Sequence, residues 1–304
     1  MHSLRHGYSL VLRIVVLTII LFACFAIAGA LAQPPRPEAT AGPDSAVLAL
    51  VAVCFIDTLV LSYVILCSRW SGWRLAGTVF FVFFGVATFM GLIEAAVFVT
   101  GMPPGALPRL FLMGALIAAP FSPLAVLTLG KWKAAGERGE RSGRLIMRPG
   151  AWGMKLGVIA AAYVILYFTF GYFVAWRNPV VRAYYGGADE GSFFAHMAEV
   201  LASSPWLVPF QVLRALLWVL LALPVIRMTR GGWPATALAI ALLFSVLMNA
   251  QLLLPNPYMP ATVRMVHLVE TASSNFLFGW LVGWLLTSRR EPAAAEVVAA
   301  ARAS

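Results

Sequence analysis

The sequence predicts an all-α integral membrane protein of about eight transmembrane helices, and three observations support this fold class. Of its 304 residues, 61% are hydrophobic and 11% are charged, whereas soluble domains are about 45–50% apolar and about 25% charged. Long apolar runs recur along the chain, and lysine and arginine gather in alternate connections between them. The lipid bilayer is therefore the expected partner. The net charge of +10 belongs to these connections and does not indicate a nucleic-acid partner.

Eight segments have the roughly 20 mostly apolar residues that a helix needs to cross the hydrocarbon core. In order, the segments are 10–32, 46–67, 76–99, 109–130, 154–176, 206–226, 234–254 and 263–287. They are separated by Pro/Gly-rich stretches such as "AQPPRPEATAGPD" or basic stretches such as "GKWKAAGERGERSGR". The first segment has an alternative interpretation, because its basic start and the "ALA" at 30–32 also fit a cleaved secretory signal. Its length favours a retained span.

The basic residues predict that both termini are cytoplasmic. Sixteen of the 22 lysines and arginines lie before the first span, around the connections after spans two, four and six, or in the C-terminal tail. Basic residues accumulate on the cytoplasmic side of membrane proteins. Arginine outnumbers lysine 19 to 3, which is typical of a GC-rich genome. We therefore predict the plasma (inner) membrane of a bacterium.

Similar motifs occur in the same order in the two halves of the chain. The matching pairs are "RHG" at 5–7 with "RPG" at 148–150, "SGW" at 71–73 with "GGW" at 231–233, and the Met-Pro pairs at 102–103 and 259–260. Four spans return the chain to the same side, so these motifs predict a parallel 4+4 duplication about an axis along the membrane normal. Alternatively, tryptophans and prolines mark interfaces independently in each half.

This interpretation divides the chain into two repeats and two cytoplasmic segments. The predicted units are a first four-helix repeat (1–130), a basic cytoplasmic linker (131–153), a second four-helix repeat (154–287) with an outer loop at 177–205, and a cytoplasmic tail (288–304). Within the outer loop, "EGSFFAHMAEVLASS" has amphipathic spacing. It predicts a short helix, either a lid over a cavity or a helix at the membrane interface.

The eighth predicted span begins with a polar stretch, "TVRMVHLVETASSN" at 262–275. At about 100° per residue, its polar side chains fall within an arc of roughly 140°. The residues on this arc are Arg264, His267, Glu270, Thr271, Ser274 and Asn275. Ionisable and amide groups at membrane depth are costly, so they usually mark a site or a packing pair.

The predicted binding or coupling residues come from five spans. They are Asp57, Glu94, Arg214, Asn249, Gln251, His267, Glu270 and Asn275. Most of them lie in the predicted outer half of the bilayer, and we expect them to converge on one cavity open to the non-cytoplasmic side. The structural alternatives are an ion pair of Arg214 with Glu94 or Glu270 and hydrogen bonds between helices. Arg109 and Arg264 are expected to snorkel to the headgroups.

Two further features concern the shape of the fourth span and the need for cofactors. Pro120 and Pro123 predict a kink or break in the fourth span. No metal-ligand spacing and no nucleotide or cofactor motif is present in the sequence, so no metal and no cofactor is expected.

The resulting functional hypotheses belong to three classes. The first is a small-solute transporter or permease-like protein with an outward-facing polar cavity and a small-molecule solute as partner. The alternative is a membrane-embedded enzyme acting on a lipid-linked or extracytoplasmic substrate, with His267 and Glu270 as an acid–base pair. A further alternative is an assembly or stabilising subunit of a membrane complex, whose protein partner the sequence does not identify.

Overall fold

The computed structural model describes residues 2–33, 43–99, 102–133, 144–187, 191–255 and 259–287. Over these ranges the protein is built from helices and contains no β-strand. The predicted tail (288–304) and the centre of the predicted basic linker (134–143) lie outside the described residues.

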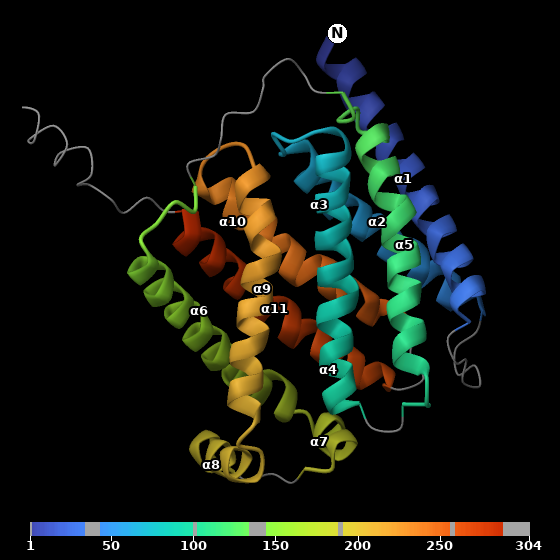
Figure 1. The fold of residues 1–304 in the computed structure, drawn as a ribbon. Helices are drawn as coiled ribbons and strands as arrows, with labels where there is room; N and C mark the ends of the chain where they lie inside the picture. Colours follow the sequence, from blue (N-terminus) through green and yellow to red (C-terminus); the bar gives the residue numbers. More distant parts are fainter. Residues whose placement is uncertain are drawn as a thin grey trace, which may run out of the picture.

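The helices follow one another along the chain (Figure 1). The first half contains α1 (His2–Ala32), α2 (Pro43–Leu66), α3 (Gly72–Phe84), η1 (Gly85–Phe89), α4 (Met90–Phe98) and α5 (Ala106–Thr128). The second half contains α6 (Pro149–Phe170), η2 (Gly171–Trp176), α7 (Pro179–Tyr185), α8 (Phe193–Ser203), α9 (Leu207–Met228), α10 (Trp233–Leu242), η3 (Leu243–Leu247), η4 (Ala250–Leu253) and α11 (Ala261–Thr287).

Seven helical stretches among the described residues are long and apolar enough to cross a membrane. They are Ser9–Ala32, Ser45–Leu66, Gly72–Phe98, Ala106–Thr128, Pro149–Trp176, Leu207–Met228 and Trp233–Leu253. The predicted membrane-protein class is therefore confirmed. The predicted eighth span corresponds to α11, which has 27 residues but is not among the seven. Its polar first half includes Arg264, Glu270 and Asn275, which lower its mean hydropathy.

Each half of the described chain packs as a ring of four long helical segments. In the first half α1 contacts α2 and α5, and α3 also contacts α2 and α5. In the second half α6 contacts α9 and α11, and α10 also contacts α9 and α11. The two rings meet through α2 with α10, η3 and η4, through α3 and η1 with α9, and through η1 with η3. The same order of packing therefore occurs in each half, and the second and third helical segments of each half form the contact between halves.

A reciprocal backbone contact joins the two halves at one end of the bundle. Ser68, just after α2, forms an isolated antiparallel bridge with Thr229, just after α9. The amide of Arg69 donates to the carbonyl of Met228, and the amide of Arg230 donates to the carbonyl of Cys67, both at 2.7 Å. A reciprocal exchange of this kind is the pattern that a two-fold axis would produce. The opposite end, where α7 and α8 lie, is called the α7–α8 end here (Figure 1).

Three spans are interrupted by a π-helical turn: η1 within α3–α4, η2 at the end of α6, and η3 after α10. A π-turn widens the helix locally and releases a backbone group from the regular ladder. The fourth span, in contrast, is one helix across Pro120 and Pro123. Ser122 lies between these prolines, and its hydroxyl donates to the Ala118 carbonyl at 2.7 Å. Of the predicted kink or break, a break is not observed in α5, and the π-helical interruptions lie in other helices.

Small residues bring α10 and α11 into close contact. A Cβ at Gly279 would lie 2.8 Å from the Ala241 Cα, and a Cβ at Gly283 would collide with the backbone of Ala237. Glycine allows helix backbones to approach closely. Close packing matters in lipid because no hydrophobic driving force brings helices together there. This contact orients the polar face of α11 toward the rest of the bundle, where the ionisable side chains lie.

Candidate functional site

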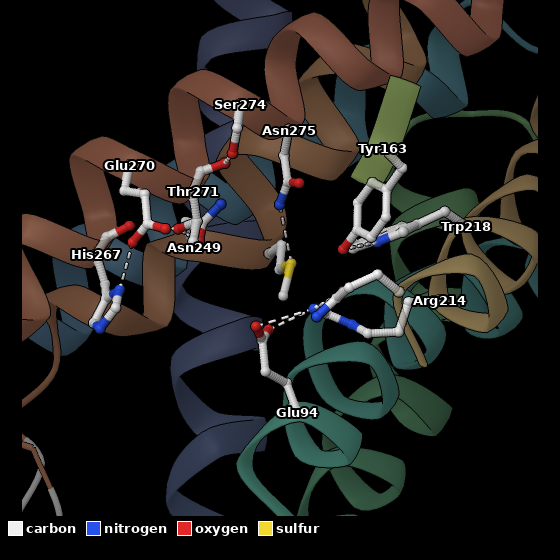
Figure 2. A network of polar contacts seen from close by, with 12 residues as sticks. Glu94, Tyr163, Arg214, Trp218, Asn249, His267, Glu270, Thr271, Ser274 and Asn275 are labelled. Atoms are coloured by element: carbon white, nitrogen blue, oxygen red, sulfur yellow. Dashed lines mark hydrogen bonds and ion pairs between the residues drawn. The ribbon is translucent and has the colours of Figure 1, made fainter. Parts of the chain in front are cut away.

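An ion pair between Glu94 of α4 and Arg214 of α9 forms the centre of the candidate site (Figure 2). The two guanidinium nitrogens Nη1 and Nη2 donate to Oε1 and Oε2 of Glu94 at 3.0 and 2.5 Å. The Arg214 side chain is 3% exposed and the Glu94 side chain is 28% exposed. This bidentate geometry is the strongest form of an arginine–carboxylate contact. It also links the two halves, since α4 belongs to the first and α9 to the second.

Polar and aromatic neighbours complete the environment of Arg214. Gln211, one turn earlier on α9, accepts a hydrogen bond from Arg214 Nη1 at 3.0 Å. The guanidinium also lies 5.7 Å from the ring centre of Tyr163 on α6. The Tyr163 hydroxyl in turn accepts a hydrogen bond from the Trp218 indole at 3.3 Å. These contacts hold the charge of Arg214 in place within a largely apolar helix.

A cavity of about 40 Å³ opens beside the ion pair. It is lined by side chains from α4, α6, α9 and α11 and by Met248 near η3; the polar ones among them are Glu94, Tyr163, Tyr167, Arg214, Glu270, Thr271, Ser274 and Asn275. A site of this volume with several polar partners can hold water, which needs roughly 10–15 Å³. Two carboxylates and one guanidinium surround this space. The guanidinium pairs with Glu94, so Glu270 depends on its contact with His267 for a compensating charge.

His267 and Glu270 form a second pair, one turn apart on α11 (Figure 2). His267 Nδ1 lies 2.6 Å from Glu270 Oε2, and His267 Nε2 lies 3.0 Å from the hydroxyl of Tyr185. Nδ1 donates to the carboxylate. Nε2 accepts from Tyr185 in the neutral ring and donates to it in the protonated ring. The hydroxyl therefore accommodates both charge states of the imidazole.

The short helix α7 places Tyr185 over His267. Its first turn is capped by Asn178, whose side-chain oxygen accepts from the Val180 amide at 2.9 Å. Its last residue is followed by Gly186, which has φ of 70°, a left-handed conformation that glycine adopts without strain. Burial raises the pKa of the Tyr185 hydroxyl above its ordinary value, so this hydroxyl stays protonated and available as a donor near neutral pH.

Two amide side chains bind carbonyl groups in or near the π-turns. Gln251 Nε2 donates to the carbonyl of Ala87 in η1 at 3.0 Å, and Asn249 Nδ2 donates to the carbonyl of Ser245 in η3 at 2.7 Å. Asn249 Oδ1 also accepts from the hydroxyl of Thr271 at 2.5 Å. Polar side chains that satisfy released backbone groups make such turns tolerable in a membrane. Asn249 and Gln251 therefore support the site without lining the cavity.

Asp57 is fully buried in α2 and lies outside the cavity. Neither of its carboxylate oxygens has a hydrogen-bond partner among the described residues, and the same holds for the hydroxyls of Thr58 and Ser62 on the same helix. Burying a polar group without a partner is costly. The structure therefore separates Asp57 from the other predicted residues and offers no physical account of what it binds.

Two sequence-based expectations, for Arg264 and for the amphipathic helix, concern the α7–α8 end. Arg264 does not snorkel, since it is 8% exposed and donates from Nη1 to the carbonyls of Leu252, at 3.0 Å, and Leu254. These carbonyls, at the end of η4 and just after it, lie within reach of Arg264 and bind it in place of the more distant headgroups. The predicted amphipathic helix forms as α8, but its buried His196 packs on Tyr172 and Trp176 of η2 rather than on the cavity.

The structure thus brings four of the eight predicted residues to one cavity and leaves the others nearby or apart. Glu94, Arg214, Glu270 and Asn275 line it, whereas His267 reaches it only through Glu270. Sequence reasoning missed Gln211 and Tyr185. Gln211 is three residues before Arg214 and shares its helix face, which is a usable signal. Tyr185 gave no signal, because its contact spans 82 positions.

Among the described residues, no group of three or more histidine, cysteine, aspartate or glutamate side chains is arranged to hold a metal ion. Comparisons with protein-family models, with characterised proteins and with solved structures found no match for this chain.

Proposed function

We propose that this protein is a small-solute transporter or permease-like protein of a bacterial plasma membrane, coupled to the movement of protons. In this proposal α11 is the eighth span, both termini are cytoplasmic, and the chain is a parallel 4+4 duplication. The matching rings of helices and the reciprocal contact at Ser68 and Thr229 support the duplication. Two such units can rock against each other to expose a site alternately to the two sides of a membrane.

The Glu94–Arg214 ion pair beside Glu270 is the observation that carries the proposal. Arg214 belongs to the second half and binds Glu94 of the first half, while Glu270 lines the same cavity. Relative motion of the halves would separate the first pair and leave Glu270 as the alternative partner. The uncompensated carboxylate would then take up a proton. This is how ionisable groups buried in membrane proteins relay protons.

The size of the cavity indicates which state the structure represents. A space of about 40 Å³ accommodates water but no organic solute. In the proposed cycle this is a closed state, with the charged groups paired and the solute site collapsed. Opening at the α7–α8 end would require Tyr185 to release His267.

Proton movement in proteoliposomes tests the proposal. Vesicles containing purified protein and a trapped pH-sensitive dye would be exposed to amino acids, sugars, nucleosides, monocarboxylates and alkali cations in turn. We expect solute-dependent proton movement with at least one class, reduced at least tenfold in Glu94→Gln and Glu270→Gln. Glu199→Gln, an exposed carboxylate on α8, serves as the matched control. Proton movement equal to that of protein-free vesicles for every class would reject transport.

The geometry of His267 favours a second candidate, a membrane-embedded enzyme. A histidine whose Nδ1 is held by a carboxylate is the arrangement of a general base. Products formed from inner-membrane lipid extracts would be followed by mass spectrometry. This candidate requires His267→Gln to abolish turnover while Glu94→Gln leaves the chemistry intact. Transport requires the reverse order of severity, because Glu94 forms the contact between the halves.

A further inference from the structure

A second hollow lies far from the polar cavity, on the outside of the bundle. It is a groove of about 500 Å³ between α3 and α9, close to the end opposite α7 and α8. Its walls are Trp70, Trp73, Arg74, Gly77, Thr78 and Phe81 on one side and Leu220, Leu223, Pro224 and Arg227 on the other. None of these residues belongs to the proposed transport site.

The groove is polar at one end and apolar along its length. Arg74 and Arg227 are exposed and lie where α3 begins and α9 ends. The stretch from Arg74 to Phe81, like that from Arg227 back to Leu220, covers about 10 Å along its helix at about 1.5 Å per residue. Phe81 and Leu220 are 41% and 50% exposed at the far end. This profile matches a lipid molecule, with a charged headgroup above and an acyl chain below.

The charges of the groove select the headgroup. Among the described residues no acidic side chain lines the groove, so no carboxylate there neutralises either guanidinium group. The Arg74 guanidinium lies 3.8 Å above the ring centre of Trp70, which holds it at the mouth of the groove. Two positioned arginines bind phosphate oxygens well, and tryptophan favours the interfacial depth at which lipid phosphates lie.

The related position between α2 and α10 lacks both charges. Counting from the paired Ser68 and Thr229, Arg227 corresponds to Leu66 and Arg74 corresponds to Ala235. The basic groove is therefore a property of one side of the bundle and not of the shared architecture.

We propose that the groove between α3 and α9 is a binding site for one anionic glycerophospholipid. Its phosphate lies between Arg74 and Arg227, and one acyl chain lies along Gly77, Phe81 and Leu220. The lipid contacts a helix from each half of the chain. This inference stands independently of the transport proposal, because it uses none of the same residues.

Native mass spectrometry of the purified full-length protein in detergent tests the site. Dioleoyl phosphatidylglycerol and dioleoyl phosphatidylcholine would be titrated separately, since they share acyl chains and differ in net charge. We expect phosphatidylglycerol to bind more tightly to the native protein. The double variant Arg74→Gln/Arg227→Gln is expected to weaken its binding by about tenfold or more and to leave phosphatidylcholine unchanged. Arg148→Gln, exposed and predicted to lie on the same side of the membrane, should have no such effect.

A second variant tests the acyl part of the groove without changing charge. A side chain at Gly77 meets open space, so Gly77→Leu fills the groove without a clash and should reduce the binding of both lipids. Glycerol 3-phosphate, which has the phosphate but no acyl chain, should not compete. The proposal is overturned if the double arginine variant binds phosphatidylglycerol as the native protein does. It is also overturned if Gly77→Leu has no effect or if glycerol 3-phosphate competes.

Discussion

The two halves of this protein pack their helices in the same order, but the polar cavity lies mainly in the second half. Each half is a ring of four long helical segments, and the rings meet through the second and third segment of each half. The polar cavity, however, is lined mainly by α6, α9 and α11 of the second half, with Glu94 as a contribution from the first. Counting from Ser68 and Thr229 sets Arg214 against Val53 and Trp218 against Asp57. Shared architecture therefore does not bring shared chemistry.

The difference has a physical reason. A charge in a membrane interior needs partners that are fixed in place, and each set of partners replaces apolar packing between helices. Here the partners of the buried charge are gathered at one place, the contact between the halves. The ring of the first half can therefore pack through small and apolar residues. In the first half Asp57 is the exception, because it is buried without a partner among the described residues.

The largest effect is expected from removing one partner of the ion pair. Glu94→Leu leaves the Arg214 guanidinium buried without its carboxylate, which should lower the free energy of unfolding by about 3–5 kcal/mol. The double variant Glu94→Leu/Arg214→Met should lose much less, because no unpaired charge remains. Unfolding in SDS, followed by circular dichroism, measures both. If the double variant lost as much stability as Glu94→Leu, or more, the pair would not couple the halves. Glu199→Leu is the control.

A smaller effect is expected from adding a methyl group where helices touch within the second half. Gly279→Ala places a Cβ 2.8 Å from the Ala241 Cα, so two backbones must separate, at about 1–3 kcal/mol. At the contact between halves, Gly85→Ala meets only the end of the Leu221 side chain, which can rotate away. The same unfolding assay should rank Gly279→Ala below Gly85→Ala in stability. The opposite ranking would show that the less deformable contact lies between the halves and not within the second half.

A gain in stability is expected at Asp57. Replacing it by leucine removes an unpartnered buried carboxyl group from the first half, and the free energy of unfolding should rise by about 1–2 kcal/mol. Asp57→Asn keeps a polar group at the position and should bring little gain. A loss of stability in Asp57→Leu would instead reveal that the carboxyl group has a bound partner, and this half would then have a polar site of its own.

The smallest effects are expected from the amides that bind the carbonyls at the π-turns. Gln251→Leu leaves the Ala87 carbonyl without its donor, and Asn249→Leu does the same to the Ser245 carbonyl. Each should cost about 1 kcal/mol. Gln251 binds a carbonyl of the other half, whereas Asn249 binds only groups of the second half, Ser245 and Thr271. The effect of Gln251→Leu should therefore be non-additive with that of Glu94→Leu, and the effect of Asn249→Leu should be additive. Matching additivity for both variants would contradict this distinction.

Several local features could be predicted from the sequence. The predicted spans 109–130 and 206–226 correspond to α5 (Ala106–Thr128) and α9 (Leu207–Met228), because long apolar runs in a bilayer leave the backbone no alternative to a helix. The polar arc of α11 was predictable from helical periodicity, and the pairing of Arg214 with Glu94 or Glu270 was among the stated alternatives. Arg264 was misassigned because the carbonyls it binds belong to η4, a turn that periodicity does not indicate.

By itself, the sequence determined the membrane class, the positions of most spans and the set of costly polar groups, since hydropathy and helical spacing act over neighbouring residues. Only the tertiary structure decided that Arg214 binds Glu94, that Tyr185 covers His267 and that Asp57 stands apart. These outcomes depend on how rings of helices pack, and on π-turns whose carbonyls need a donor from elsewhere in the chain. Such contacts join residues separated by 82 to 164 positions, a separation at which local patterns carry no information.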